Sequence, residues 1–425
     1  MKVFKYPTQQ EWLEIAKRPG FEKTALDSLV KDILNEVKLN GDSALKIYAQ
    51  KFDGVSLNEL TVTDAEIGAA NKMVPDNLKA AIKIAQQNIE KFHAAQINEE
   101  AVVETSKGVN CWRKSVGIEK VGLYIPGGSA PLFSTILMLG IPAQLAGCKE
   151  IVLCTPPNKE GKINPAILYT ANLIGITKIY KVGGAQAIAA MAYGTESIPN
   201  VYKIFGPGNQ FVTKAKELVQ LDGLAIDMPA GPSEVLVIAD ETGNPEFIAA
   251  DLLSQAEHGA DSQVILLSNN EELINATNEE LAKQLNELPR KEIAAKSLEN
   301  SAAVLLKDMD SCIELSNDYA PEHLILASEN ADSFTDKVTN AGSVFIGNYS
   351  CESAGDYASG TNHTLPTNGY ARNYSGVSLD SFVRKITFQK LSKEGINNIG
   401  PAIELMAEAE ELFAHKNAVT LRLKD

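Results

Sequence analysis

The segment DLLSQAEHG, at residues 251–259, combines side chains that could bind a metal ion. Apolar spacing from Pro245 onward predicts a helix that runs into this segment. Gln255 and His258 are three residues apart, so both project from one face of that helix and could hold one ion. A histidine that caps the helix or packs against it would account for the same pair equally well.

Other candidate metal ligands lie farther along the chain. Asp356 and His363 fall within residues 350–376, a stretch rich in Gly, Ser, Asn and Tyr, and His415 closes the last predicted helix. The chain has five histidines, and four of them stand at turns or element ends near polar residues. Imidazole, carboxylate and amide ligands together suit zinc or a similar borderline metal.

An acid–base pair is suggested by Glu322 and His323, which follow Pro321 at the entry to a predicted strand. Proline fixes the turn before them. Adjacent Glu and His offer a proton acceptor and a second group that can orient water. The alternative interpretation is a turn with a solvated carboxylate.

Three glycine-rich turns, at residues 124–129, 183–186 and 206–209, each follow a predicted strand and precede a predicted helix. Glycine at such a turn lets backbone N–H groups approach an anion at the start of the helix. None of the three completes the GxGxxG pattern, and each alone could be an ordinary turn. At the carboxyl ends of neighbouring strands, together they favour a nucleotide-binding crevice.

The elements that must position these residues change character along the chain. Residues 23–100 have the apolar spacing of helices. Later, apolar strand-like runs alternate with helices in two sets, at 121–125, 151–155, 178–182 and 201–205, then 234–239, 263–267, 303–307, 324–327 and 343–347. Such runs indicate parallel sheets covered on both faces. We therefore expect an α/β fold with two Rossmann-like parallel-sheet domains and small helical N-terminal and C-terminal units.

Composition excludes several classes of protein. The net charge of −15, from 39 Lys and Arg against 54 Asp and Glu, argues against a nucleic-acid binder. The most apolar stretch, residues 132–146, is too interrupted to span a membrane, and the first 21 residues lack the apolar core of a signal peptide. Five cysteines without a CxxC pair suit reduced thiols, so we expect a cytoplasmic protein.

Taken together, these motifs resemble the histidinol dehydrogenase family over essentially the whole chain. The shared motifs are VGLYIPGG, GGAQAIAA, FGPGN, AGPSEVLVIAD, DLLSQAEHG, YAPEHL, GDYASGTNHTLPT and a histidine near the C-terminus. The resemblance implies a four-electron oxidation of L-histidinol to L-histidine, through a bound L-histidinaldehyde, by two molecules of NAD. It also implies one zinc ion per subunit and a homodimer with active sites built from both subunits.

The resemblance implies roles for individual residues as well. The zinc ligands, which also contact the substrate, would be Gln255, His258, Asp356 and His415. Further substrate contacts would come from Ser233, His323, His363 and Glu410, and NAD contacts from Tyr124, Gln186 and Asn209. In the acid–base pair, His323 would remove the hydroxyl proton and Glu322 would activate the water that adds to the aldehyde.

On this basis we divide the chain into four parts. Residues 1–22 form an N-terminal segment, and residues 121–232 form a Rossmann-like NAD-binding domain. Residues 23–120 and 233–375 together form a discontinuous α/β domain with the metal and acid–base residues. Residues 376–425 form a small helical arm for dimerisation.

Two other functions remain open at this point. A metal-dependent hydrolase would use Glu322 to activate a zinc-bound water, but it would leave the three glycine-rich turns without a role. A binding protein that kept only the fold would not need Glu322, His323 and the candidate ligands.

Overall fold

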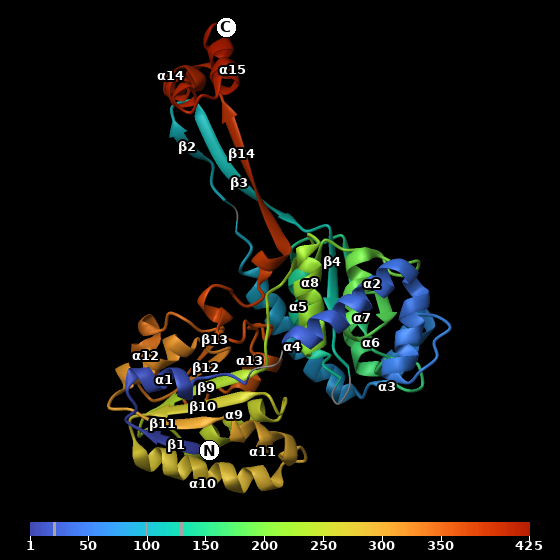
Figure 1. The fold of residues 1–425 in the computed structure, drawn as a ribbon, viewed down its shortest axis with the longest axis vertical. Helices are drawn as coiled ribbons and strands as arrows, with labels where there is room; N and C mark the ends of the chain where they lie inside the picture. The colour runs from blue at the N-terminus through green and yellow to red at the C-terminus, as the bar shows by residue number, and fades with distance from the viewer. Residues whose placement is uncertain (20–22, 99, 128–130) are drawn as a thin grey trace.

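The computed structural model describes residues 1–19, 23–98, 100–127 and 131–425. Figure 1 shows two α/β units side by side, with a long arm that projects from them and ends at the C-terminus. Gly128 and Ser129, which belong to the first glycine-rich turn, lie outside the described residues. Among the described residues, no helix is both long enough and apolar enough to cross a membrane.

The first unit contains a five-stranded parallel sheet in the order β6-β5-β4-β7-β8. Its strands are β4 (Lys120–Tyr124), β5 (Glu150–Thr155), β6 (Lys178–Lys181), β7 (Lys203–Phe205) and β8 (Ala225–Ile226). The connecting helices are α5 (Ser134–Leu145), α6 (Pro165–Leu173), α7 (Gly184–Tyr193) and α8 (Gln210–Leu221). Because the helices cover both faces, the central strands are apolar on both sides, as the sequence predicted.

Three helices from the N-terminal part of the chain complete this unit. They are α2 (Lys23–Tyr48), α3 (Asp64–Met73) and α4 (Asp76–Ala94). Helix α2 packs on α7 and α8, α3 on α6, and α4 on α5. The sequence predicts that residues 23–120 share a domain with residues 233–375, whereas these helices bury their apolar faces against the five-stranded unit. Helical periodicity identifies the buried face of a helix but not the surface that covers it.

The second unit contains a six-stranded parallel sheet in the order β1-β11-β10-β9-β12-β13. Its strands are β1 (Lys2–Lys5), β9 (Glu234–Ala239), β10 (Gln263–Ser268), β11 (Ala302–Leu305), β12 (His323–Ala327) and β13 (Ser343–Ile346). Helices α9 (Pro245–Ala256), α10 (Glu271–Glu287) and α11 (Lys291–Glu299) cover one face. Helices α1 (Gln9–Ile15) and α12 (Met309–Tyr319) cover the other.

The N-terminal segment is thus part of the second unit. Strand β1 pairs with β11 at the edge of the sheet, and Trp12 of α1 is buried in the core. The remaining short elements are a π-helix at Ala49–Asp53, 3-10 helices at Ala331–Lys337, Tyr370–Arg372 and Leu379–Phe382, and α13 (Glu352–Tyr357).

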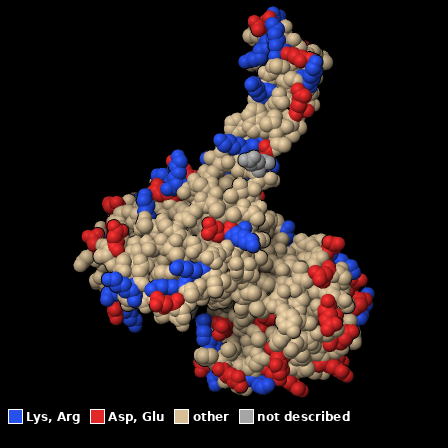
Figure 2. Space-filling view, turned by 180° about the vertical axis from the view of Figure 1, so that it is seen from behind, with Lys and Arg blue, Asp and Glu red and all other residues tan. Residues whose placement is uncertain are grey.

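The arm consists of a β-ribbon that carries two helices. Strands β2 (Val103–Ser106), β3 (Val109–Gly117) and β14 (Val383–Leu391) pair antiparallel, and α14 (Lys393–Ala409) and α15 (Phe413–Leu423) pack on each other at the tip. These helices form the small C-terminal unit that the sequence predicted, but the ribbon was not foreseen. Positive and negative side chains are interspersed over the face seen in Figure 2, including the tip of the arm.

Candidate functional site

The acid–base candidates lie at the amino edge of the six-stranded sheet. Glu322 directly precedes β12 and His323 is its first residue, next to Glu234, the first residue of β9. Helix α9 runs antiparallel to the strands, so its C-terminal end brings Gln255 and His258 to this same edge. The sequence placed Glu322 and His323 correctly at the entry to β12. The prediction that Gln255 and His258 project from one helix face was wrong for His258, because α9 ends at Ala256 and His258 lies in the turn that follows.

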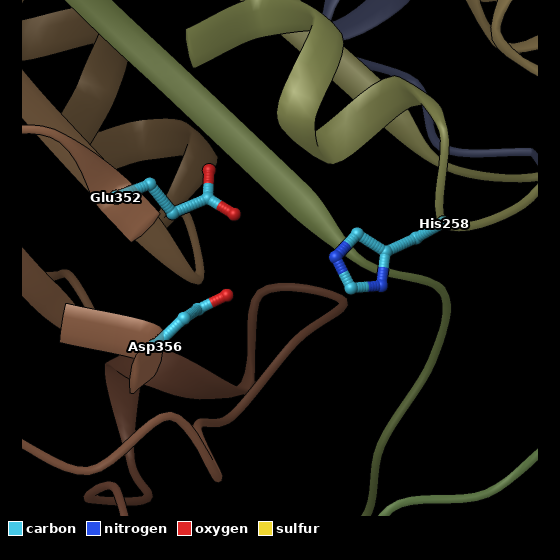
Figure 3. Close-up of side chains that lie close together, drawn as sticks. All are labelled: His258, Glu352 and Asp356. Carbon is cyan, nitrogen blue, oxygen red and sulfur yellow. The ribbon is translucent and has the colours of Figure 1, made fainter. Parts of the chain in front are cut away.

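A compact group of possible metal ligands lies beside them. His258, Glu352 and Asp356 each offer a ligand atom, and these atoms lie within 4.8 Å of one another. Figure 3 shows the carboxylates of Glu352 and Asp356 projecting from α13 toward the imidazole of His258. Two of these residues, His258 and Asp356, were predicted as zinc ligands from the resemblance.

Three buried polar atoms here have no hydrogen-bond partner among the described residues: His323 Nε2, Glu352 Oε2 and Asp356 Oδ1. His323 Nε2 lies 3.5 Å from Asp356 Oδ1. Leaving one buried polar group unpaired costs about 1–3 kcal/mol, so three in one place indicate that another species satisfies them. Imidazole and carboxylate ligands fit a divalent cation such as zinc.

Gln255 connects the metal-ligand group to the acid–base pair. Its Nε2 atom lies 3.0 Å from the carbonyl oxygen of Glu234 and 3.1 Å from Nδ1 of His323. The amide nitrogen is therefore engaged within the protein, which leaves the amide oxygen as the atom that could bind a metal. Oε2 of Glu322 accepts a hydrogen bond of 2.9 Å from the backbone N–H of Glu234, which fixes the carboxyl group in place.

Burial and mutual repulsion shift the acidity of the whole group. Burial raises the pKa of Glu322 to about 8 and the pKa of Glu352 to about 8. Burial alone would lower the pKa of His323, but the carboxylates around it, chiefly Glu352, outweigh burial and raise that pKa to about 10. The raised pKa of Glu322 and of Glu352 keeps both carboxyl groups largely protonated near neutral pH, and a bound cation would favour their ionised forms.

His363 links this site to the other unit. Its Nδ1 atom lies 2.8 Å from the backbone oxygen of Asp356, and its Nε2 atom lies 3.0 Å from Oγ1 of Thr135 at the start of α5. The neighbouring Asn362 donates from Nδ2 to the carbonyl oxygen of Met138, 2.6 Å away. The loop after α13 therefore contacts both units, and Ser233 stands just before β9 at the same edge.

The predicted NAD contacts lie together on the five-stranded unit. Tyr124, Gln186 and Asn209 all line one cavity of about 1290 Å³. Tyr124 is buried, its Oη accepts a 3.0 Å hydrogen bond from Gly184 N, and burial raises its pKa to about 12. Asn209 caps the N-terminus of α8. Its Oδ1 atom accepts hydrogen bonds from the backbone N–H groups of Phe211 and Val212, at 3.1 and 3.2 Å.

This cavity lies at the carboxyl ends of β4, β6 and β7, where the three glycine-rich turns were predicted to meet. Gly206 has a φ of +132°, and a Cβ atom at this position would lie 2.1 Å from the carbonyl oxygen of Tyr124. Only glycine allows the turn to pack so closely against β4. Pro131 lines the cavity, and Thr135, four residues later at the start of α5, contacts His363, so the two sites are neighbours.

Two predicted site residues lie elsewhere within one chain. Glu410 follows α14 and His415 lies in α15, and both are exposed at the tip of the arm, far from the two units (Figure 1). The structure does not bring them to the other candidate residues of the same chain.

Glu352 is the site residue that the sequence analysis missed. It is almost fully buried, at 1% exposure, and precedes Asp356 by one helical turn. Two acidic residues four apart share one face of a helix, but six helical residues within the stretch 350–376 carry too little periodicity for the sequence to predict that helix.

Comparisons with known proteins agree along the full chain. The family model for histidinol dehydrogenase matches residues 16–423. A histidinol dehydrogenase from Bacteroides thetaiotaomicron is 62% identical over 423 residues, which cover 100% of this chain and 99% of that protein. One from Shigella sonnei is 53% identical over 419 residues, covering 98% and 96%.

A solved structure supports the same assignment. The crystal structure of histidinol dehydrogenase from Elizabethkingia anophelis superposes with a TM-score of 0.98 at 62% identity, covering 100% of this chain and 98% of that one. The chain therefore belongs to the histidinol dehydrogenase family, and it is an oxidoreductase of histidine biosynthesis.

Proposed function

We propose that this enzyme oxidises L-histidinol to L-histidine in two zinc- and NAD-dependent steps, through an L-histidinaldehyde that stays bound. One histidinol, two NAD⁺ and one water give histidine, two NADH and three protons. The observation that carries the proposal is the group of His258, Glu352 and Asp356, with its unpartnered buried atoms, directly beside Glu322 and His323.

The zinc site would use Gln255, His258, Asp356 and His415 of the partner subunit, with Glu352 as an additional carboxylate close enough to bind. Zinc, when bound, would hold the imidazole and the amine of the substrate and so act mainly as a template. Ser233, His323, His363 and Glu410 of the partner subunit would complete the substrate contacts. Holding the substrate at several points keeps the aldehyde from escaping between the two steps.

The proton transfers fall to the acid–base pair. His323 would take the hydroxyl proton of histidinol as the first hydride leaves the carbinol carbon. Glu322 would take a proton from the water that adds to the aldehyde, and the resulting hydrate would lose the second hydride. Positioned groups of this kind typically contribute about 10²–10⁴-fold to a rate. The hydrogen bond from Glu234 N to Glu322 supports this assignment, because it aims the carboxyl group without engaging both oxygens.

NAD would bind in the cavity of the five-stranded unit, where Tyr124, Gln186 and Asn209 are gathered. When bound, NAD accepts the hydride in each step. A cavity of about 1290 Å³ is large enough for an extended dinucleotide. The helix starts at Gly184 and Gln210 face the same end of the sheet and would favour its phosphates.

A homodimer with shared sites would account for the position of the arm. The tip exposes a set of large apolar side chains: Leu405, Met406, Leu412, Phe413 and Leu421. Exposed apolar side chains grouped on one small unit favour burial against another surface. All five cysteines are free thiols, which supports the proposed cytoplasmic location.

The central experiment counts NADH formed per histidinol consumed by the zinc-loaded enzyme. Two NADH per histidinol are expected from the four-electron reaction. A ratio of one would limit the enzyme to the alcohol step. Absence of NADH with consumption of a hydrolysable substrate would favour the metal-dependent hydrolase, and zinc binding without any turnover would favour the binding protein.

A further inference from the structure

Arg18 connects the N-terminal segment to the first residue of β9. Its side chain is 17% exposed, and its Nε and Nη2 atoms lie 2.5 and 2.9 Å from the two carboxylate oxygens of Glu234. The Glu234 side chain is only 2% exposed. This bidentate geometry requires the planar guanidinium group, and the ammonium group of a lysine could not reproduce it.

The backbone of Glu234 holds three residues of the proposed site. Its N–H donates to Glu322 at 2.9 Å, and its carbonyl oxygen lies 3.0 Å from Gln255 Nε2 and 3.1 Å from His323 Nδ1. The position of the main chain at this one residue therefore sets the positions of all three side chains. Arg18 anchors the side chain of the residue whose main chain makes these contacts.

Arg18 also holds the turn that carries the acid–base pair. Its Nη2 atom donates to the carbonyl oxygen of Tyr319 at 2.8 Å, and the guanidinium carbon lies 3.9 Å from the centre of the Tyr319 ring. The next residue, Ala320, has a φ of +54°, a left-handed conformation that is unfavourable for alanine. Pro321, Glu322 and His323 follow at once, so the turn needs external support.

A third contact reaches the loop that carries His363. The backbone N–H of Asn368 donates to Oε1 of Glu234 at 2.9 Å. The same carboxylate that Arg18 grips therefore also secures the loop of residues 358–377. Arg18 joins β9, the turn before β12 and this loop through one buried ion pair.

We propose that Arg18 is a positioning residue for the oxidation of histidinol: through Glu234 and the 319–321 turn, it sets the geometry of Glu322 and His323. A buried ion pair is a poor source of stability, because desolvation offsets its Coulomb attraction. Its value here lies in the fixed orientation of the groups attached to it. The proposal rests on the proposed function, since it takes Glu322 and His323 as the acid–base pair.

The test compares Arg18→Lys with Lys5→Met, which removes an exposed ion pair with Glu271 from the same N-terminal segment. Arg18→Lys keeps a cation near Glu234 but loses the two-pronged contact. We expect kcat per zinc-loaded subunit to fall about tenfold to a hundredfold, with the KM for NAD, the zinc content and the thermal midpoint close to wild type. Lys5→Met should match wild type in every measurement.

A second variant separates positioning from folding. Arg18→Met alone leaves a buried carboxylate unpaired, so it could lose activity merely by unfolding. The double variant Arg18→Met/Glu234→Gln removes that charge, and we expect its thermal midpoint to recover while its kcat stays low. Lowered thermal midpoints with a normal kcat per zinc-loaded subunit would show a structural role only.

The outcomes distinguish the two proposals. Wild-type enzyme that forms no NADH from histidinol would overturn the proposed function, and the role of Arg18 with it. Active wild-type enzyme with a normal kcat in both Arg18→Lys and the double variant would overturn the role of Arg18 alone.

Discussion

The two parallel sheets of this molecule place their candidate sites at opposite edges. The five-stranded sheet has its cavity at the carboxyl ends of the strands, which is where open α/β sheets usually bind ligands. The six-stranded sheet instead gathers its polar groups at the amino ends, around Glu234 and His323. Similar strand patterns thus do not determine whether a site lies at the amino ends or at the carboxyl ends of the strands.

Polar side chains that pair with one another at the carboxyl ends of the six-stranded sheet explain part of the difference. At its carboxyl end, Ser328 Oγ donates to Asp240 at 2.6 Å, and Thr242 Oγ1 donates to the other oxygen of Asp240 at 2.5 Å. Asn348 then donates to the carbonyl oxygen of Thr242 at 3.0 Å. These side chains satisfy one another, and Asn269 Oδ1 is a single unpaired buried atom at this end, whereas three unpaired buried atoms lie together beside the amino end. The clustering of unpaired atoms, and not the fold, indicates the site.

The largest expected effect tests whether the metal binds at the amino ends of the six-stranded sheet. Loss of a residue that merely orients a metal ligand costs about 10–100-fold, so His258→Ala should lose most of its zinc and nearly all activity. Binding of NAD to the other sheet should persist, as measured by quenching of protein fluorescence. Stoichiometric zinc with a near-normal rate would show that the ligand assignment is wrong.

The next prediction asks whether a second chain completes the six-stranded site. His258→Ala and His415→Ala homodimers should each be nearly inactive. If His415 acts on the partner, random mixing makes about half the dimers mixed, each with one intact site, so activity should return to about a quarter of wild type. No recovery after verified subunit exchange would contradict the shared site.

A smaller effect is expected from Glu322→Gln, because only the second step needs an activated water. Oxidation of the aldehyde should slow by about 10²–10³-fold, more than oxidation of the alcohol, in single-turnover measurements from each substrate. His323→Asn should slow the first step as well. Equal losses in both steps for Glu322→Gln would refute the division of roles.

Glu352→Gln tests the residue that the sequence analysis missed, and it should change two properties in opposite directions. Zinc affinity, measured by competition with a chelator, should fall by about 10–100-fold. The thermal midpoint of the metal-free protein should rise near neutral pH, because burial raises the pKa of Glu352 and folding must then protonate this group, a cost that glutamine does not have. Unchanged zinc affinity would exclude Glu352 from the metal site.

The smallest expected effect lies on the five-stranded sheet. Asn209→Ala should raise the KM for NAD about tenfold and lower stability by about 1 kcal/mol, since it loses the cap of α8. Asn209→Asp keeps the cap and should restore the thermal midpoint, but its charge should still weaken NAD binding. Zinc content should not change in either variant. Normal NAD affinity in both would argue against this cavity as the cofactor site.

Sequence reasoning predicted the two sheets well because strand and turn signals are local. The turn at Gly206 could be recognised from neighbouring residues alone. Partners that are distant in the sequence could not be recognised in this way. The apolar spacing of α2 does not reveal which sheet it packs against, and no residue near β1 indicates that this strand pairs with β11. Glu352 was missed because six residues of helix inside a glycine-rich stretch carry too little periodicity.

The separation of the two sites onto different sheets has a kinetic consequence for the proposed reaction. Each substrate molecule meets two oxidant molecules in turn, so one reduced dinucleotide must leave and a fresh one must arrive while the aldehyde waits. The described residues that line the cavity all belong to the five-stranded unit, so the exchange of the dinucleotide need not disturb Gln255, His258 or Asp356. In the proposed reaction, the residence time of the aldehyde and the exchange rate of the dinucleotide would then be set by different parts of the molecule.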